Sequence, residues 1–347
     1  MAHELEIRNG QASMMYVGEV PWHGLGTKLA HPATSAEAIQ AARLDWKVVK
    51  MPLWAADGGG CEESNRFAVV RSDLWGTDTD AILGVVGPGY TPLQNHEAFQ
   101  FFDDIVGEGA AIYHTAGALG NGRRVWILAQ LPTSIRVAGD DHVDKFLLLS
   151  NSHDGSSCVE VKFTPVRVVC QNTLSLALRW GRTLRIPHTR HVKDRLAEAR
   201  ELLGIVEDGF AKAGMVFRRM AELPMSRGAL TWYLQEVFPY PADGEDAARA
   251  ARAARHRSWA EYFFREGAGN REEKVRGTLW AAYNGVTEYV DHRKLDQTSD
   301  RRLASLWFGE GRRVKARAFA AAVSMLPRQP RQMVEELEEM EISLCPN

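Results

Sequence analysis

Residues 146–195, FLLLSNSHDGSSCVEVKFTPVRVVCQNTLSLALRWGRTLRIPHTRHVKDR, decide how the rest of the chain is interpreted. Two apolar, β-branched runs flank Asp154-Gly155, and an Asp-Gly pair between such runs is a strong hairpin signal. Thr164-Pro165 ends the second run. Because threonine is a good helix N-cap and proline is tolerated at the first helical position, we expect a helix that begins here and ends near Gly181.

The same stretch concentrates positive charge. From Val161 to Arg195 there are eight Lys or Arg and one acid, Asp194, although the formal net charge of the chain is −2. On the expected helix, one polar stripe at every fourth position faces away from the apolar side. Its members are Arg167, Gln171, Ser175 and Arg179. We expect these arginines and their basic neighbours to line one groove.

Nucleic acid is the natural ligand of such a groove, because each phosphate that is neutralised releases counterions. The residues expected to contact phosphates are Lys162, Arg167, Arg179, Arg182, Arg185 and Arg190. Single-stranded nucleic acid also needs aromatic side chains for base stacking. The candidates are Trp180, Phe163 and Tyr113. The alternative is a solvated polar stripe above core aromatics.

The surrounding sequence indicates an α+β protein. Residues 1–60 are turn-rich and predict an arm or capping segment, with a short helix over 34–44 and Ser35 as its N-cap. Residues 61–192 predict an α+β core, an antiparallel or mixed sheet with packed helices, one of them from about Asn95 to Val106. Asn121-Gly122 predicts a turn before a strand. Residues 193–347 predict a helical C-terminal half.

Composition places the chain among folded, soluble proteins, and its 347 residues suggest more than one compact unit. No apolar run is long enough for a secretory signal or a membrane helix, so we expect the cytoplasm of a bacterial host cell and no membrane partner. Four scattered cysteines predict reduced thiols. With 42 Lys and Arg against 44 Asp and Glu, only a local cluster would attract a polyanion.

No pattern predicts a catalytic residue, a metal site or a cofactor. Cys170 with Asn172 and a distant His153 could form a thiol nucleophile, but Cys170 falls on the apolar face of the expected helix. His188 and His191 lack any known metal-binding pattern. A nuclease would need a carboxylate cluster for Mg²⁺, and the acids near the groove have no recognisable metal spacing. Those acids are Asp141, Asp144, Asp154 and Glu160.

Several motifs resemble those of the phage/plasmid-like protein family of unknown function, whose members are found in bacteriophage genomes, prophages and plasmids. They are PWHGLG (21–26), TPVRVVCQNTLSLAL (164–178), TLWAAYNGVTEYVDH (278–292) and WFGEGRRVKARAF (307–319). The hairpin and expected helix are also similar to the core of single-strand annealing recombinases of the Rad-fifty-two type. That resemblance implies binding of single-stranded DNA by oligomeric rings, without nucleotide hydrolysis. It places Lys162, Arg167, Arg179 and Arg182 where backbone-binding residues lie.

We therefore expect a non-enzymatic, single-stranded DNA-binding protein of a phage or mobile element. It would promote annealing during recombination and act as a homo-oligomer. The alternative is a protein-interaction or anti-host-defence factor without nucleic-acid binding, which docks through its helical half. In that case the basic stripe would be solvated or paired with acids of the C-terminal helices.

Overall fold

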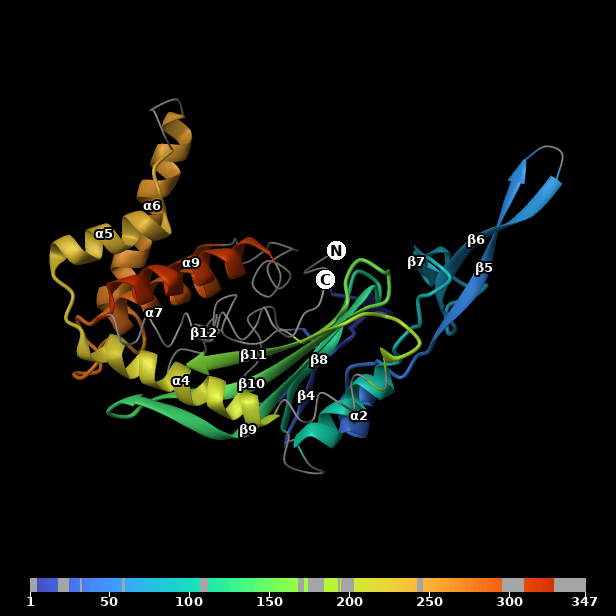
Figure 1. Cartoon of the computed structure of the whole chain (residues 1–347), viewed down its shortest axis with the longest axis horizontal. Coiled ribbons are helices and arrows are strands. Elements are labelled where there is room, and N and C mark those ends of the chain that lie inside the picture. Colours follow the sequence, from blue (N-terminus) through green and yellow to red (C-terminus); the bar gives the residue numbers. More distant parts are fainter. Residues whose placement is uncertain are drawn as a thin grey trace. The chain divides into compact units, whose positions relative to one another are not determined.

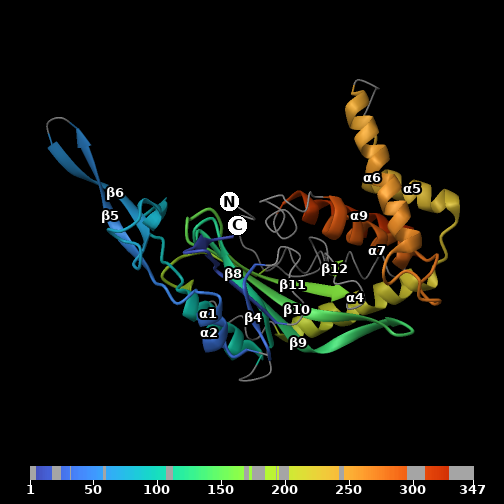
Figure 2. The same cartoon turned by 180° about the vertical axis from the view of Figure 1, so that it is seen from behind.

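The computed structural model describes residues 5–17, 25–31, 33–57, 60–106, 112–167, 172–173, 184–192, 194, 203–241, 246–294 and 309–327 (Figures 1 and 2). The chain folds as two compact units. Unit 1 comprises Met1–Pro132, Phe146–Lys162 and Thr183–Gly204, and unit 2 comprises Thr133–Lys145, Phe163–Arg182 and Ile205–Asn347. Residues 60 and 192, where the sequence suggested segment boundaries, both fall inside unit 1.

The larger sheet is mixed, which confirms the α+β expectation. Its strands run in the order β12-β11-β10-β9-β8-β3-β4, and β13 also pairs with β11. β3 and β4 pair in parallel, whereas β3–β8, β8–β9, β11–β12 and β11–β13 are antiparallel. The strands are β3 Met14–Val17, β4 Thr27–Leu29, β8 Ile112–Leu119, β9 Arg124–Ala138, β10 Asp141–Ser152, β11 Val159–Arg167, β12 Asn172–Thr173 and β13 Leu184–Ile186.

A second sheet, of order β5-β6-β7, belongs to unit 1. Its strands are β5 Val48–Asp57, β6 Gly60–Arg71 and β7 Ile82–Val86, and β7 follows a 3₁₀ turn, Thr79–Ala81. Near its base, Ala68 and Val70 form a small apolar cluster with Ala81. A separate pair of short strands, β1 Ile7–Arg8 and β2 Gln11–Ala12, precedes β3.

Both expected turns are confirmed. Asp154-Gly155 lies in the turn between β10 and β11, and Gly155 has a φ of +76°. Asn121 and Gly122 lie between β8 and β9 with φ angles of 60° and 93°. Positive φ is the reason these turns use glycine and asparagine, since other residues with a Cβ pay a steric cost there.

The prediction of a helix that begins at Thr164-Pro165 is wrong for the residues of it that the structure describes. Residues 164–167 continue β11, where Val166 pairs with Thr173 and Arg167 with Asn172 of β12. The remainder of the expected helix lies outside the described residues. The fixed φ of proline suits an extended strand as well as a first helical turn, so pairing with neighbouring strands decides between them.

Unit 1 has two described α-helices, both expected from the sequence. α1 spans Ser35–Ala41, and its N-cap is Thr34 rather than Ser35, because the Thr34 hydroxyl accepts a hydrogen bond from the Glu37 backbone while the Glu37 carboxylate accepts from Thr34. This reciprocal arrangement is a capping box. α2 spans Asn95–Val106.

The described helices of unit 2 are α4 Leu203–Glu222, α5 Arg227–Val237, α6 Ala247–Glu266, α7 Leu279–Tyr289 and α9 Glu310–Met325, with a π-helical turn at Val290–Lys294. Every residue of α7 is buried. Around it lie a tilted ring contact between Phe217 and Trp280, and a hydrogen bond of 2.6 Å from Trp280 Nε1 to Asp141. α7 is therefore the centre of this unit.

Among the described residues, no helix combines the length and the apolar character that crossing a bilayer requires.

Candidate functional site

β11 carries three of the residues predicted to bind nucleic acid. Lys162, Phe163 and Arg167 have strand backbone, and their side chains lie outside what the structure describes. Arg179, Trp180 and Arg182 lie wholly outside the described residues. Their convergence on a groove stays a prediction, and the helical stripe that linked Arg167 to Arg179 cannot begin at Arg167, because that residue is in a strand.

The other two predicted basic residues are exposed. Arg185 on β13 lies directly across from Glu160 on β11, and its Nε is 3.2 Å from the carboxylate. The Arg185 side chain is 61% exposed. Arg190 is also exposed, and its Nε donates to His191 Nε2 at 2.9 Å. Both guanidinium groups can reach a phosphate, although Glu160 offsets part of the charge of Arg185.

Tyr113 is a core residue, so its predicted role in base stacking is wrong. Its ring is 1% exposed and lies 5.3 Å from the ring of Phe99. Its hydroxyl donates to Phe99 O at 3.0 Å and to Asp103 at 2.6 Å. Burial raises the pKa of Tyr113 far above its usual value, with help from Asp103.

An exposed basic element of unit 2 is α6, whose sequence is AARAARAARHRSWAEYFFRE. Alanine and arginine are among the strongest helix formers, so this helix needs little tertiary support. Asp246 caps it by accepting from the Arg249 backbone at 3.0 Å, and Gly267 follows its last residue. From Ala247 to Ser258 it carries four arginines and no acid.

α6 packs on α7 through its small residues. Ala253 and Ala260 are buried, and α7 approaches so closely that a Cβ on Gly285 would meet the Phe264 nitrogen at 2.7 Å. Arg252 and Arg255 are exposed on another side. At 100° per residue, Arg252, Arg255, Trp259 and Tyr262 share an arc of about 80° and span about 15 Å. We call these four residues the α6 stripe.

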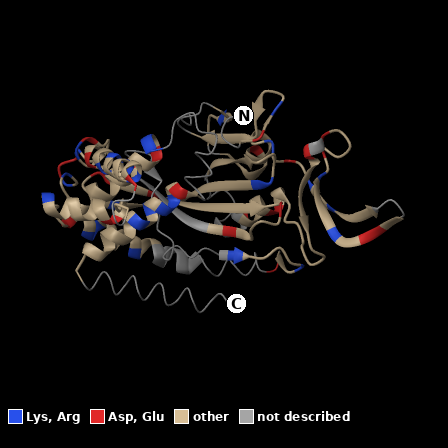
Figure 3. Cartoon of the chain, turned by 90° about the horizontal axis from the view of Figure 1, so that it is seen from above, with Lys and Arg blue, Asp and Glu red and all other residues tan. Residues whose placement is uncertain are grey.

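The charge of the α6 stripe is available to a ligand. Within the part of the chain that the structure describes, Arg252 and Arg255 have no ion-pair partner, whereas Arg249 is paired with Asp246 at 3.0 Å. Figure 3 shows Lys and Arg positions across the helices in blue. Arginine suits an anionic partner because its planar guanidinium can both bind phosphate and stack.

Aromatic rings complete the stripe. Trp259 and Tyr262 meet edge to face with centroids 5.7 Å apart, and the guanidinium of Arg293 lies 5.0 Å from the Trp259 ring. Tyr262 is 51% exposed. Nearby, Arg257 donates to Phe238 O at 2.6 and 2.9 Å and lies over the ring of Tyr240 at 3.7 Å. Arg257 is therefore engaged, while about half of Tyr262 is exposed beside its ring contacts with Trp259 and Phe263.

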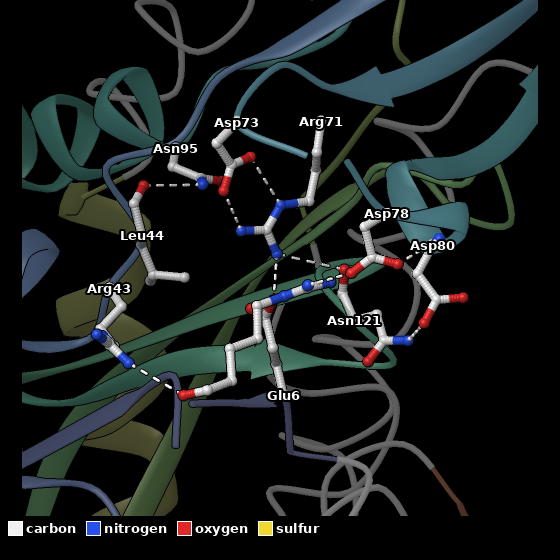
Figure 4. A network of polar contacts seen from close by, with 10 residues as sticks. Glu6, Arg43, Leu44, Arg71, Asp73, Asp78, Asp80, Asn95 and Asn121 are labelled. Atoms are coloured by element: carbon white, nitrogen blue, oxygen red, sulfur yellow. Dashed lines mark hydrogen bonds and ion pairs between the residues drawn. The ribbon is translucent and has the colours of Figure 1, made fainter. Parts of the chain in front are cut away.

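Unit 1 contains a different cluster, which is polar and has the buried Glu6 and Arg71 at its centre (Figure 4). The Arg71 guanidinium pairs with Glu6 and with Asp73, at 2.8 Å for the latter, and lies 4.1 Å from the ring of Trp46. Arg8 bridges Glu6 and Asp78 at 2.5 and 2.6 Å. Asn121 from the β8–β9 turn donates to Asp80 at 2.8 Å. These contacts join the end of β6 to the first strands and to that turn.

His153 lies at the inner edge of this cluster. Its Nε2 is 3.0 Å from Asn95 Oδ1, and the Asn95 amide nitrogen donates to Leu44 O. Because Asn95 thus presents its oxygen at the shorter distance, we assign the imidazole proton to Nε2, which also lies 3.4 Å from Asn151 Nδ2. Nδ1 is buried, with no hydrogen-bond partner among the described residues. Burial lowers the pKa of His153 to about 3, helped by His188 and Arg71, so the ring is neutral at pH 7.

His188 is held in a similar way from the segment after β13. Its Nδ1 lies 3.3 Å from Thr91 O, and its ring stacks on Tyr90 at 4.6 Å. The Tyr90 hydroxyl donates to Ser152 O at 2.9 Å. Burial lowers the pKa of His188. Neutral rings locked by carbonyl and amide oxygens are suited to ordering a core, and we read the cluster as structural.

The acids considered for a metal site have other partners. Asp141 accepts from Trp280, and Asp154 accepts from the Ser156 backbone at 2.9 Å. Glu160 pairs with Arg185. Across the described ranges, no three His, Cys, Asp or Glu side chains lie close enough to share a metal ion. Cys170, the thiol considered as a nucleophile, lies outside those ranges.

Comparison with domain families gives one match. Residues 82–307 match a domain of unknown function, DUF932. The chain belongs to the DUF932 family. The DUF932 match includes α6 and His153 but begins after Trp46, whose ring meets His153, and after Arg71, whose charge acts on it. Comparisons with curated proteins and with solved structures gave no match.

Sequence reasoning missed the α6 stripe. The signal that could have found the stripe is the spacing itself. Arg252, Arg255, Trp259 and Tyr262 lie three, four and three residues apart, which is the period of one helix face.

Proposed function

We propose that this DUF932 protein binds single-stranded nucleic acid without catalysing a reaction on it. The observation that carries the proposal is the α6 stripe, in which two exposed arginines, without an ion-pair partner among the described residues, precede an exposed tyrosine on one side of a helix. Phosphate contacts and base stacking together are what sequence-tolerant binding of single strands requires.

The basic segment that includes β13 is the second part of the proposal. Arg185 and Arg190 are exposed, and we propose that they contact phosphates together with Lys162, Arg167, Arg179 and Arg182. Trp180 and Phe163 are the proposed stacking residues of that segment. The resemblance to phage, plasmid and annealing-recombinase families favours annealing of single-stranded DNA by a homo-oligomer in a bacterial cytoplasm as its setting.

Fluorescence anisotropy with a labelled oligothymidine, measured over a salt series, tests the proposal. Replacing Arg252 and Arg255 by alanine should weaken binding. It should also make the negative slope of log K against log salt shallower by about 1.4, because each lost phosphate contact on a single strand removes about 0.7. Tyr262→Ser should weaken binding about tenfold and leave that slope unchanged, since stacking is not a charge effect.

The matched control is Arg265→Ala/Arg271→Ala, which removes the same charge from unit 2 at sites already paired with Glu261 and Glu266. This control should bind nearly as the parent does. Equal losses in both double variants would reduce the effect to net charge and overturn the role of the α6 stripe. Absence of binding by the parent at low salt would overturn the proposed function.

A further inference from the structure

Among the described residues, none covers the outer part of the β5–β6 hairpin. β7 pairs only with Phe67–Val70 of β6, and beyond them β5 and β6 continue as a two-stranded ribbon to Asp57 and Gly60. Figures 1 and 2 show this ribbon extending away from the base of its own sheet. Residues 54–56 and 60–66 are all exposed. Such a ribbon is marginally stable in water by itself, so a covering partner would stabilise it.

One face of the ribbon combines an indole with a carboxylate. Trp54 is 58% exposed and lies directly across from Glu63, so both side chains share a face. Glu62, the next residue along β6, pairs with Ala55 and is exposed on the opposite face of the ribbon, and neither glutamate has an ion-pair partner within the described residues. From Met51 to Asn65 the sequence contains no Lys or Arg. An indole beside a carboxylate fits a guanidinium, which can stack on the ring and pair with the acid.

This chemistry excludes several partners. A phosphate backbone or an anionic membrane would be repelled by Glu62 and Glu63, because like charges oppose docking. The ribbon fits a surface that offers guanidinium groups and aromatic rings together. The same chain carries such a surface in the α6 stripe, where Arg252 and Arg255 lack an acidic partner among the described residues.

We infer that a second copy of this chain docks its α6 stripe against the β5–β6 ribbon of the first. Trp54 and Glu63 of one copy face Arg252 and Arg255 of the other, and Trp259 and Tyr262 extend the contact toward the ribbon base. The inference rests on charge complementarity between these two surfaces of the described residues. Each copy keeps a ribbon and a stripe, so the contact can form a reciprocal pair, a ring, or an open chain of copies if the rotation between copies does not close.

Nucleic acid and the β5–β6 ribbon should compete for the α6 stripe, and this expectation rests on the proposed function. Single-stranded nucleic acid would use the same arginines as the ribbon does, so an oligonucleotide in excess should separate the copies. The docking itself does not depend on nucleic acid. It should weaken with salt, because exposed ion pairs are screened.

Sedimentation velocity of the full chain, over a wide concentration range at low salt, tests the docking. Glu62→Arg/Glu63→Arg and Arg252→Glu/Arg255→Glu should each lower the association constant by about tenfold or more. An equimolar mixture of the two variants should restore association, because a basic ribbon then meets an acidic stripe. Glu236→Arg/Glu273→Arg is the charge-matched control and should leave association unchanged.

A parent chain that stays monomeric at every concentration overturns the inference. So does an oligomer that neither variant weakens, or a mixture that fails to restore association while both variants retain the parental circular dichroism. Anisotropy separates this result from the proposed function. Association without oligonucleotide binding would contradict only the proposed function. Oligonucleotide binding by a strict monomer would contradict only the proposed docking.

Discussion

His153 connects distant parts of the unit 1 sequence through a single ring. Its Nε2 donates to Asn95 at the start of α2, its ring meets Trp46 edge to face at 5.3 Å, and its backbone nitrogen donates to Arg123 O at 2.8 Å. Because the ring is neutral in the fold, protonation must break or strain this arrangement. The residue therefore couples the stability of unit 1 to pH.

We expect the free energy of unfolding to fall as the pH drops from about 6.5 toward 3. In that window the unfolded chain protonates His153 while the fold, with a pKa of about 3, resists it. The charges that act on His153 are His188, Arg71 and Asp154. Chemical denaturation at several pH values measures the slope, which His153→Gln should reduce although it also destabilises the protein at pH 7.

The lowered pKa values of His188 and His114 give slopes of the same sign, so the comparison with His153→Gln is essential. An unchanged slope in the variant would show that His153 does not titrate between the two states. The sequence did not predict this role, because Trp46, Asn95 and Arg71 lie more than fifty residues from His153 and have no local pattern in common. It named the histidine only as a distant partner for Cys170.

At the scale of the elements, local signals decided the turns but not the segment after β11. Asp154-Gly155 and Asn121-Gly122 require positive φ, a property that tertiary packing rarely overrides. Thr164-Pro165 is compatible with both a strand and the start of a helix. The strands that pair with this segment decide between them, and a local pattern does not contain them. The α6 stripe was readable from its period, but its exposure was not, because burial depends on α7.

A buried ion pair joins α9 to the π-helical turn after α7. Lys315 Nζ lies 2.9 Å from Asp291 Oδ1, and the side chains are 1% and 4% exposed. Lys315→Met should lower the free energy of unfolding by about 3–5 kcal/mol, because it leaves a carboxylate buried without this cation. Thermal and urea unfolding measure the loss.

Lys315→Met/Asp291→Leu should recover a large part of that loss, since two apolar side chains avoid the desolvation of both charges. Arg317→Met serves as the control on the same helix, because Arg317 is exposed. If the double variant is less stable than the single one by an additive amount, the pair is not the source of the effect.

At the scale of the whole molecule, the family match and the compact units begin and end at different residues. The DUF932 match begins at residue 82, yet β3 pairs with β8, and β6 pairs with β7. A fragment of residues 82–307 would expose one edge of β8 and leave β7 without its neighbour. The α+β class was predictable from composition and periodicity, whereas this dependence on the first 81 residues was not, because strand pairing is non-local.

We expect the 82–307 fragment to lack a cooperative thermal transition and near-ultraviolet circular dichroism, both of which the full chain should show. Exposed edges and uncovered apolar surface also favour aggregation. Co-expression with residues 1–81 should restore part of the soluble, folded material. A fragment that unfolds cooperatively at the temperature of the full chain would place the folding information within the DUF932 match alone.

α7 has a consequence for how this chain can vary. Every residue from Leu279 to Tyr289 is buried, and Gly285 admits no Cβ beside α6. A substitution on any side of this helix should therefore destabilise the fold. In a library of single substitutions, this segment should therefore retain the fewest survivors. The exposed alanines of α6 should accept almost any helix-forming replacement. Substitutions should therefore accumulate quickly in α6 and slowly in the neighbouring α7.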